Sequence, residues 1–479
     1  MAQDNKEPYL KQFTNAFADM RRLPPAFWII VITFAVESMA YFGMLHEMVP
    51  YLLGLDWSAG VATMVVSIFT GLVTLFMLGA GSYAEGFGLR RAIIFATVLC
   101  AAGRFAFAYS AKAGNWNLET ILVLGSFLIV ALGEGILQPV CYSGVKQYSD
   151  EKTSSMGYGL IYAVMNVGII VIGAIAVWVR PAIDKLLAGA PASGMDQLLT
   201  PILPRVDNGF EAINWISVAI NIMAFLGFMA LFTSRREATK LRPDSAESLR
   251  KEKTLPVWAR VKAYFTEGPF TNTRFLFFIF MLLPVRTLFA HQWLTLPTYI
   301  LRAYSKDVQD WMEAIVMWTN PAIIAVAMPV ATAATRHLSV YRVMVIGSLI
   351  SALPTFLLCA PPNIYLLLAY LVIFSIGEAI WSGRFLEYAS ELAPEGKIAQ
   401  YMGLANIPWL LAKTTTGFYA GFMLDKFCPP GAAVGEMQTA KLWGIYGLIA
   451  MASPIGLWLA RNWVKAGLNE QTSERKAAQ

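Results

Sequence analysis

Twelve long apolar segments run through the 479-residue chain and leave few folds open to it. A helix that crosses a bilayer needs about 20 apolar residues, and its backbone hydrogen bonds must be satisfied within the segment. Outer-membrane barrels have shorter segments of alternating polarity. We therefore predict an all-α integral membrane protein with 12 transmembrane helices, at about 26–53, 58–81, 91–111, 119–145, 155–179, 212–234, 275–301, 309–335, 342–360, 363–391, 398–424 and 440–463.

The composition supports this prediction, because 57% of the residues are hydrophobic and 14% are charged, whereas soluble domains have about 45–50% and about 25%. The net charge of +6 fits cytoplasmic loops rich in Lys and Arg, so no nucleic-acid partner is predicted. Four cysteines and three histidines show no metal-binding or disulfide spacing. Phosphate-binding loops and catalytic constellations are missing from the sequence. We expect no cofactor, no metal and no enzymatic activity.

Basic residues between the apolar segments gather on the side that carries both termini. Arg90, Arg91 and Arg342 lie in short connections on that side, and short loops are the ones that set orientation. The charged stretch 235–273 lies there as well. We expect both termini in the cytoplasm and the chain in a bacterial cytoplasmic (inner) membrane.

A repeated pair of motifs divides the chain into two halves. Gly133-Glu134-Gly135 is followed by Met156-Gly157, and Gly377-Glu378-Ala379 is followed by Met402-Gly403. Parallel repeats of this kind are related by a pseudo-two-fold axis along the membrane normal, with the substrate site between them near the midplane. We predict three parts: a six-helix bundle at 1–234, a cytoplasmic linker at 235–273 and a six-helix bundle at 274–479.

Three glutamates inside the predicted helices are candidates for proton coupling. An ionisable group in a span costs roughly 2.5–3.5 kcal/mol, so it faces the protein interior or a partner. Glu37 lies about 16 Å along its helix, near the bilayer midplane, and Glu378 and Glu134 also lie well inside their segments. Structural alternatives are open for two of them: Glu37 as a group bonded to neighbouring helices, and Glu134 as part of an interhelical salt bridge.

Cations inside the predicted helices are candidates for binding the negative end of a substrate. Arg286 lies near the middle of its segment. Arg384 is a second candidate, although Glu387 and Glu391 share its helix face and offer local ion pairs instead. His291 is either a group that titrates near neutral pH or a hydrogen-bonded core residue. Two other cations are expected to join neighbouring helices: Arg104 and Lys413.

Aromatic and amide side chains complete the predicted substrate site. Aromatic residues make up 13% of the chain, which suits both the interfacial belts of membrane helices and the wall of a cavity. Besides the two arginines, Glu378 and His291, the predicted substrate-binding residues are Tyr41, Gln138, Tyr142, Gln292, Trp293 and Trp381.

The connection after the second apolar segment carries the motif of a known superfamily. Gly81 to Arg91 reads G-S-Y-A-E-G-F-G-L-R-R, which resembles the G-x-x-x-D-R-x-G-R-R signature of the major facilitator superfamily. Gly81, Gly88 and Arg90 fit the pattern, with Arg91 directly after it, whereas Glu85 stands in place of the usual Asp and Gly86 and Leu89 replace two basic positions. Glycines permit a tight turn, and the charged groups can bridge helix ends. The resemblance implies two six-helix bundles and solute transport.

Three stretches are similar to motifs of the proton-dependent oligopeptide transporters, a branch of that superfamily. Glu37 to Met44 resembles the pattern E-x-x-E-R-F-x-Y-Y-G-M, and Gly133 to Pro139 resembles G-x-G-x-x-K-P. Gly377-Glu378-Ala379 and the later Ala393-Pro394 and Met402-Gly403 are similar to the run G-E-A, A-P and M-G. The resemblance implies a proton site at Glu37 and contact between Glu378 and a substrate amino group.

The sequence departs from that family at three positions that bear on the substrate. Phe34 stands at the family's first Glu of the helix, Ser38 at its Arg, and Gln138 at its Lys. In the family the two cations serve the peptide carboxylate and proton coupling. Ordinary dipeptides are therefore expected to be poor substrates, and Arg286 is expected to take the negative end of the solute.

These features predict a secondary transporter that moves a small organic solute by alternating access. Symport of a peptide-like or amino-acid-like solute with protons is the leading prediction, because a carboxylate in a low-dielectric cavity binds protons more readily than one in water. One alternative is a facilitator or drug-type exporter with an aromatic cavity. Another is a membrane receptor or enzyme, which would need a catalytic constellation or a large soluble domain. The expected partners are the solute, protons and the lipid bilayer, and the chain is expected to act as a monomer.

Overall fold

The computed structural model describes residues 20–84, 88–150, 153–241, 269–335, 338–391, 405 and 407–464. Within these residues every regular element is helical and no strand is present. The chain forms two compact units. Unit 1 consists of Met1–Met44, Leu72–Ile172 and Asn214–Thr254, and unit 2 consists of Leu45–Gly71, Gly173–Ile213 and Leu255–Gln479. The predicted domain boundaries at 234 and 274 stay a prediction.

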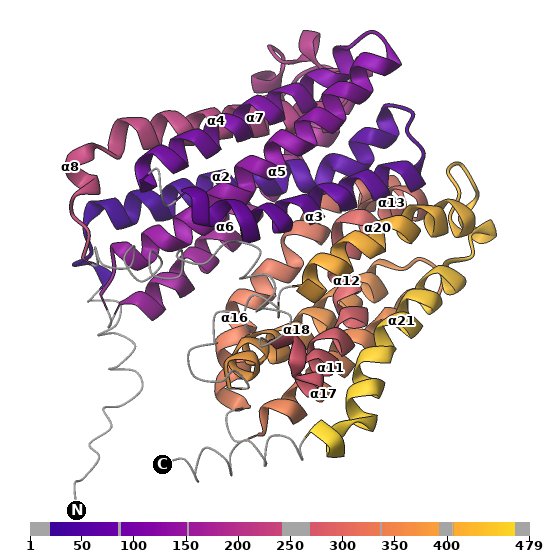
Figure 1. Cartoon of the computed structure of the whole chain (residues 1–479). Helices are drawn as coiled ribbons and strands as arrows, with labels where there is room; N and C mark the ends of the chain where they lie inside the picture. Colours follow the sequence, from indigo (N-terminus) through magenta and orange to yellow (C-terminus); the bar gives the residue numbers. More distant parts are fainter. Residues whose placement is uncertain are drawn as a thin grey trace, which may run out of the picture. The chain divides into compact units, whose positions relative to one another are not determined.

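Long continuous helices make up most of the described chain (Figure 1): α2 Pro25–Gly54, α3 Ala59–Ala84, α4 Leu89–Tyr109, α5 Trp116–Gln147, α6 Ser154–Leu187, α7 Gly209–Leu231, α18 Ile364–Glu391, α20 Ile407–Phe427 and α21 Thr439–Leu459. Other stretches are divided: α11 Thr273–Met281, α12 Leu283–Leu294 and α13 Leu296–Ala303; α15 Met312–Met317 and α16 Thr319–Ala334; and α17 Val340–Ala352 with the 3-10 turn Leu353–Cys359. Two short helices lie between longer elements: α8 Ser234–Glu237 and α14 Lys306–Gln309.

Ten helices in the described part of the chain are long and apolar enough to cross a membrane. The predicted segments 309–335 and 398–424 are not among them. The first corresponds to α15 and α16, with a shorter apolar stretch at Met312–Met328. The second corresponds to α20, where Lys413 is followed by three threonines. The protein is therefore an integral membrane protein, and the count of twelve spans stays a prediction.

Prolines divide the segment that the sequence predicted as one helix over 275–301. α12 begins after Leu282 with Pro284 in its first turn, and α13 begins after Thr295 with Pro297 in its first turn. Proline has no N–H for the preceding turn and its ring clashes with that turn, whereas the first turn of a helix tolerates it. The helix is therefore interrupted twice within this segment, at Leu282 and at Thr295.

Many large apolar side chains of the long helices face outward, whereas several charged side chains lie inside. Ile121, Val326 and Leu448 are 67%, 70% and 68% exposed, which leaves a large apolar surface of the kind that contacts lipid. By contrast, Glu37 and Arg104 are each 1% exposed. This arrangement fits helices whose ionisable groups avoid the hydrocarbon.

In unit 1, α5 packs along α4 (Figure 1). The helices approach closely at Gly133, where a Cβ atom would lie 3.0 Å from the carbonyl oxygen of Ala96. Small residues permit such close contact between membrane helices. This packing brings Arg104 of α4 beside Glu134 of α5.

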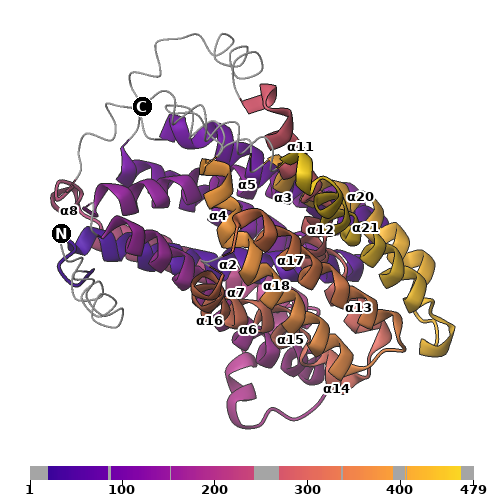
Figure 2. The same cartoon turned by 90° about the horizontal axis from the view of Figure 1, so that it is seen from below.

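In unit 2, α18 contacts both α16 and α17 (Figure 2), and α12 contacts α20 and α21. The part of α3 that belongs to this unit is held against α20 by polar contacts. Thr63 Oγ1 donates to the carbonyl of Gly417 at 3.1 Å and accepts from the N–H of Gly421 at 3.0 Å. The glycines let the two helices approach closely.

The basic end of the Gly81–Arg91 motif joins the start of α4 to the region after α7. Gly88 precedes α4 with a φ of 84°, a conformation that favours glycine. The Arg90 side chain donates through Nε to the carbonyl of Phe232 at 2.7 Å, and its backbone N–H donates to the Glu237 carboxylate at 3.2 Å. Glu85 lies outside the described residues.

Candidate functional site

A buried cluster in unit 1 joins two carboxylates to one guanidinium, and we call Glu37, Arg104 and Glu134 the acid–arginine cluster. Glu37 comes from α2, Arg104 from α4 and Glu134 from α5. Arg104 Nη1 pairs with Glu37 Oε1, and Nη2 lies 2.6 Å from Glu134 Oε1. All three side chains are at most 3% exposed. Arg104 therefore joins three helices, as predicted.

Two side-chain amides donate hydrogen bonds to the carboxylate oxygens of Glu37 and Glu134 that Arg104 does not bind. Asn221 of α7 donates to Glu37 Oε2 at 2.6 Å, and Gln138 donates to Glu134 Oε2 at 3.3 Å. Glu37 and Glu134 are thus bonded to neighbouring helices, as their structural alternatives predicted. If both carboxylates are ionised, the cluster carries one negative charge that no described cation balances, because Arg104 supplies the single positive charge. One added proton would neutralise the cluster.

The same place brings three potential metal ligands together. Ligand atoms of Glu37, Glu134 and Cys100 all lie within 4.8 Å of one another. The guanidinium of Arg104 already binds both carboxylates, so a cation occupies the position that a metal would take. The geometry fits an ion-paired cluster better than a metal site.

In unit 2, Glu378 of α18 is bonded to an amide. Asn320 of α16 donates through Nδ2 to Glu378 Oε2 at 2.6 Å and lies 3.0 Å from Ser375 Oγ. Glu378 is 9% exposed. Among the residues that the structure describes, no Lys, Arg or His lies within ion-pair distance of it. This carboxyl group thus differs from the two in unit 1, which share an arginine.

Arg286 of α12 is a buried cation surrounded by aromatic rings. Its guanidinium carbon lies 4.2 Å from the ring centre of Phe385 and 5.6 Å from that of Trp381. Nη1 lies 3.5 Å from the carbonyl of Ala405, and Nε has no hydrogen-bond partner. Across the described ranges, no carboxylate pairs with it. Cation–π contacts compensate only part of the desolvation of a guanidinium.

Glu378 and Arg286 are close to a common residue. Trp381 follows Glu378 by three positions on α18, and side chains at this spacing share a helix face. The Arg286 guanidinium lies over the Trp381 ring. Unit 2 therefore has a buried carboxylate and a buried guanidinium, both without an opposite charge in the described part of the chain, and Trp381 is adjacent to the first along α18 and in contact with the second.

Further aromatic residues lie near Trp381. The Phe289 ring lies 6.0 Å from Trp381 and 5.4 Å from Trp409. The His291 side chain is hydrogen-bonded and stacked within the core. Its Nδ1 lies 2.7 Å from Thr295 Oγ1, and its ring stacks on Tyr446 at 3.9 Å. His291 thus has the environment of a hydrogen-bonded core residue, one of its two predicted alternatives.

The remaining predicted residues lie in both units. In unit 1, Tyr41 is 8% exposed and packs edge-on against Phe42, and Tyr142 packs against Phe34. In unit 2, Gln292 lies 3.5 Å from Tyr370 Oη, and the indole N–H of Trp293 is buried without a partner. The Arg384 side chain lies outside the described part of the chain, as do those of Glu387 and Glu391. The substrate-binding role of these residues stays a prediction.

A second buried cluster of two carboxylates and one guanidinium, formed within unit 2, was not predicted from the sequence. Arg180 of α6 pairs through Nε with Glu313 Oε1 of α15, and its Nη2 lies 3.1 Å from Glu313 Oε2. Glu47 of α2 is fully buried with these two groups as charged neighbours, and neither of its oxygens has a hydrogen-bond partner in the described chain. We call Glu47, Arg180 and Glu313 the α6–α15 cluster.

The missed residues share a signal that the sequence does contain. Asn221 and Asn320, like Arg180 and Glu313, are polar side chains in or beside apolar segments, and such residues are expected to have partners. What the sequence does not give is the identity of those partners, because this depends on how each helix is rotated.

The chain matches a known superfamily in sequence and solved transporter structures in fold. A family model described as Major Facilitator Superfamily matches residues 27–413, and no curated protein matches the sequence. A crystal structure of the peptide transporter POT in complex with sulfate is 16% identical, with a TM-score of 0.67 over 92% of this chain and 95% of that chain.

Two further structures have similar scores. A POT family transporter in complex with 5-aminolevulinic acid is 15% identical, with a TM-score of 0.63 over 92% of this chain and 97% of that chain. A bacterial homologue of the human drug peptide transporters PepT1 and PepT2 is 14% identical, with a TM-score of 0.64 over 92% and 98%. At these identities the similarity concerns the fold.

Proposed function

Because the chain belongs to the major facilitator superfamily, we propose that it is a secondary transporter that moves a small organic solute by alternating access. The superfamily and the solved structures that resemble the chain are transporters and not enzymes. Proton-coupled symport is the mode that the charges of the acid–arginine cluster support best.

The observation that carries this proposal is the charge of the acid–arginine cluster. Two buried carboxylates share one guanidinium, and burying an unbalanced charge is costly. A proton on Glu37 or Glu134 makes the cluster neutral and removes one of the two ion pairs of Arg104. Because the three residues lie on three helices, protonation changes the interaction energy between α2, α4 and α5. This is the kind of coupling that links a proton to a conformational change.

Glu378 and Arg286 provide the proposed binding groups for the solute. An ammonium group would bond to the Glu378 carboxylate, and a carboxylate would bond to the free guanidinium edge of Arg286, because Arg binds carboxylates through two parallel hydrogen bonds. An amino-acid-like zwitterion carries both charges. One similar structure holds 5-aminolevulinic acid, which is such a solute.

The α6–α15 cluster supports alternating access. Arg180 lies in the first half of the sequence and Glu313 in the second, and unit 2 holds them as a buried ion pair. Alternating access requires contacts between the halves of the sequence that form and break. We assign that role to the pair of Arg180 and Glu313. The nearby Glu47 could replace Glu313 as the partner of Arg180 when the pair breaks.

The alternative of a facilitator or drug-type exporter rests on the aromatic surroundings of Arg286. Phe289, Trp381, Phe385 and Trp409 offer apolar rings to a neutral solute. Such a solute would need neither Glu378 nor a proton gradient. The two proposals therefore differ in their response to pH.

The test is uptake by the purified chain in liposomes, with and without an inward proton gradient. A thermal-shift screen of amino acids, dipeptides, organic acids and neutral aromatics first identifies a solute. We expect accumulation only with the gradient. Glu37→Gln should abolish accumulation and preserve exchange of solute, because the substitution removes one of the two carboxyl groups that share Arg104. Glu436→Gln, at an exposed position, is the matched control. Gradient-independent uptake that Glu37→Gln leaves unchanged would support the facilitator instead.

A further inference from the structure

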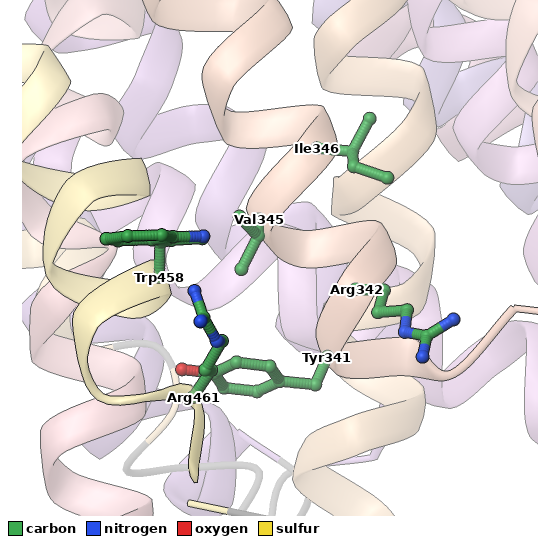
Figure 3. A pocket seen from close by; sticks show the side chains of 6 residues that line it. All are labelled: Tyr341, Arg342, Val345, Ile346, Trp458 and Arg461. Carbon is green, nitrogen blue, oxygen red and sulfur yellow. The ribbon is translucent and has the colours of Figure 1, made fainter.

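A pocket in unit 2 lies between the first turns of α17 and the end of α21. It has a volume of about 460 Å³ and is lined by Tyr341, Arg342, Val345, Ile346, Trp458 and Arg461. Figure 3 shows the Arg461 side chain between the Trp458 ring and Tyr341, with the Arg342 side chain on the opposite side of Tyr341 and pointing away from Arg461. None of the residues assigned to transport belongs to it.

The pocket has a rigid floor and a positive charge. Tyr341 is 3% exposed, and its hydroxyl donates to the carbonyl of Leu457 at 2.5 Å, which fixes α17 to α21. The Arg461 guanidinium carbon lies 4.3 Å from the ring centre of Trp458. In the described part of the chain neither Arg342 nor Arg461 has a carboxylate partner. Their charges are therefore available to an anion from outside the protein.

Apolar side chains continue from the pocket along both helices. Ile346, Leu349 and Leu353 are 45%, 38% and 55% exposed, and the spacing of three and four residues places them on one face. On α21, Ile455 and Leu459 are 49% and 69% exposed. A ligand for this site thus needs a negative group at one end and long apolar parts beside it.

We propose that this pocket binds the phosphate group of an anionic phospholipid. The acyl chains would lie on the exposed faces of α17 and α21, the phosphate would bond to Arg461, and Arg342 would add positive charge at the same pocket. Trp458 marks the depth of the headgroups, where tryptophan is enriched. The predicted orientation places this end of both helices at the cytoplasmic leaflet, which carries the anionic lipids in the membranes where the asymmetry is known.

Native mass spectrometry of the purified full-length chain in detergent tests the proposal. The chain is titrated with phosphatidylglycerol and with phosphatidylcholine of the same acyl chains. We expect at least about fivefold tighter binding of phosphatidylglycerol, as follows from about 1 kcal/mol per basic residue near an anionic lipid. Arg461→Gln should lose more of this preference than Arg342→Gln, and the double variant should lose all of it. Equal binding of the two lipids by the wild type would overturn the proposal.

The controls separate the pocket from general charge effects. Arg235→Gln with Lys240→Gln removes the same charge from a region on the same predicted side and should leave the preference unchanged. Arg342→Lys with Arg461→Lys should keep much of it. Equal loss in the control pair would refute a specific site. Displacement of the lipid by millimolar inorganic phosphate would show that the site takes a free anion rather than a headgroup.

A second measurement needs no variant. Phosphatidylglycerol with a photoactivatable group on its headgroup is crosslinked to the wild-type chain, and the labelled peptides are identified. Labels at 338–346 or 455–464 would support the proposal, and labels that avoid both stretches would overturn it.

Discussion

Replacing Arg104 by Gln removes the only cation that the described structure places between Glu37 and Glu134. Two buried carboxylates are then left without a counter-charge, at sites where neither is more than 3% exposed. Removing one partner of a buried ion pair costs about 3–5 kcal/mol. Arg104 is also among the largest fully buried side chains, so the shorter Gln leaves a void that adds to this cost.

The expected loss corresponds to a fall in melting temperature of roughly 6–20 °C, at about 2–4 °C per kcal/mol for a unit of 150–250 residues. Intrinsic tryptophan fluorescence of the purified chain in detergent measures it. The difference in melting temperature between Arg104→Gln and the wild type should be smaller at pH 5 than at pH 8, because protons neutralise the carboxylates that have lost their cation. Arg205→Gln, at an exposed position, should change stability by at most about 0.5 kcal/mol.

The triple variant Arg104→Gln, Glu37→Gln, Glu134→Gln gives the sharper test. Replacing every charged member of a buried cluster with a neutral residue costs much less than removing one member, because no buried charge is left unpaired. The triple variant should therefore recover at least half of the lost melting temperature. A single variant within about 2 °C of the wild type, or a triple variant less stable than the single one, would refute the reasoning.

Three other substitutions have defined outcomes. Arg286→Lys should weaken binding of a zwitterionic solute about tenfold in a thermal-shift titration, because Lys keeps the charge but loses the two parallel donors; strong dipeptide uptake that this substitution does not affect would contradict the assignment. Gly133→Ala should destabilise the chain by about 1–3 kcal/mol, because its Cβ would lie 3.0 Å from the carbonyl oxygen of Ala96; an unchanged melting temperature would show that α4 and α5 can move apart freely. Glu313→Gln should leave Arg180 buried without its ion pair and slow solute exchange in liposomes by at least about tenfold. Solute exchange at the wild-type rate would exclude the pair from alternating access.

The sequence was sufficient to predict the helical membrane fold but not how its polar groups pair. Apolar segments and the Gly81–Arg91 motif carry local information, and both identify the fold. Glu37 and Arg104, by contrast, are 67 positions apart, and their contact depends on the rotation of two helices that are apolar on most faces. The weak amphipathicity of these helices leaves that rotation undetermined by periodicity.

The divided helices were missed for a different reason. Pro284 and Pro297 are visible in the sequence, and each marks a helix start, but the length of the apolar segment outweighed them. Glu378 was correctly expected to be buried. Its partner Asn320 was not found, because an amide in an apolar segment does not by itself reveal which carboxyl group it bonds to.

The contact between α3 and α20 has a consequence for how the chain enters the membrane. α20 carries Lys413 in an apolar stretch, and a lysine at the centre of a helix opposes insertion by roughly 2.5–3.5 kcal/mol. Thr63 on α3 bonds two glycines of α20, and α3 is synthesised long before α20 leaves the ribosome. α20 is therefore expected to insert late and only against helices already in place, so a truncated chain that lacks α3 should leave α20 on the wrong side of the membrane or outside it.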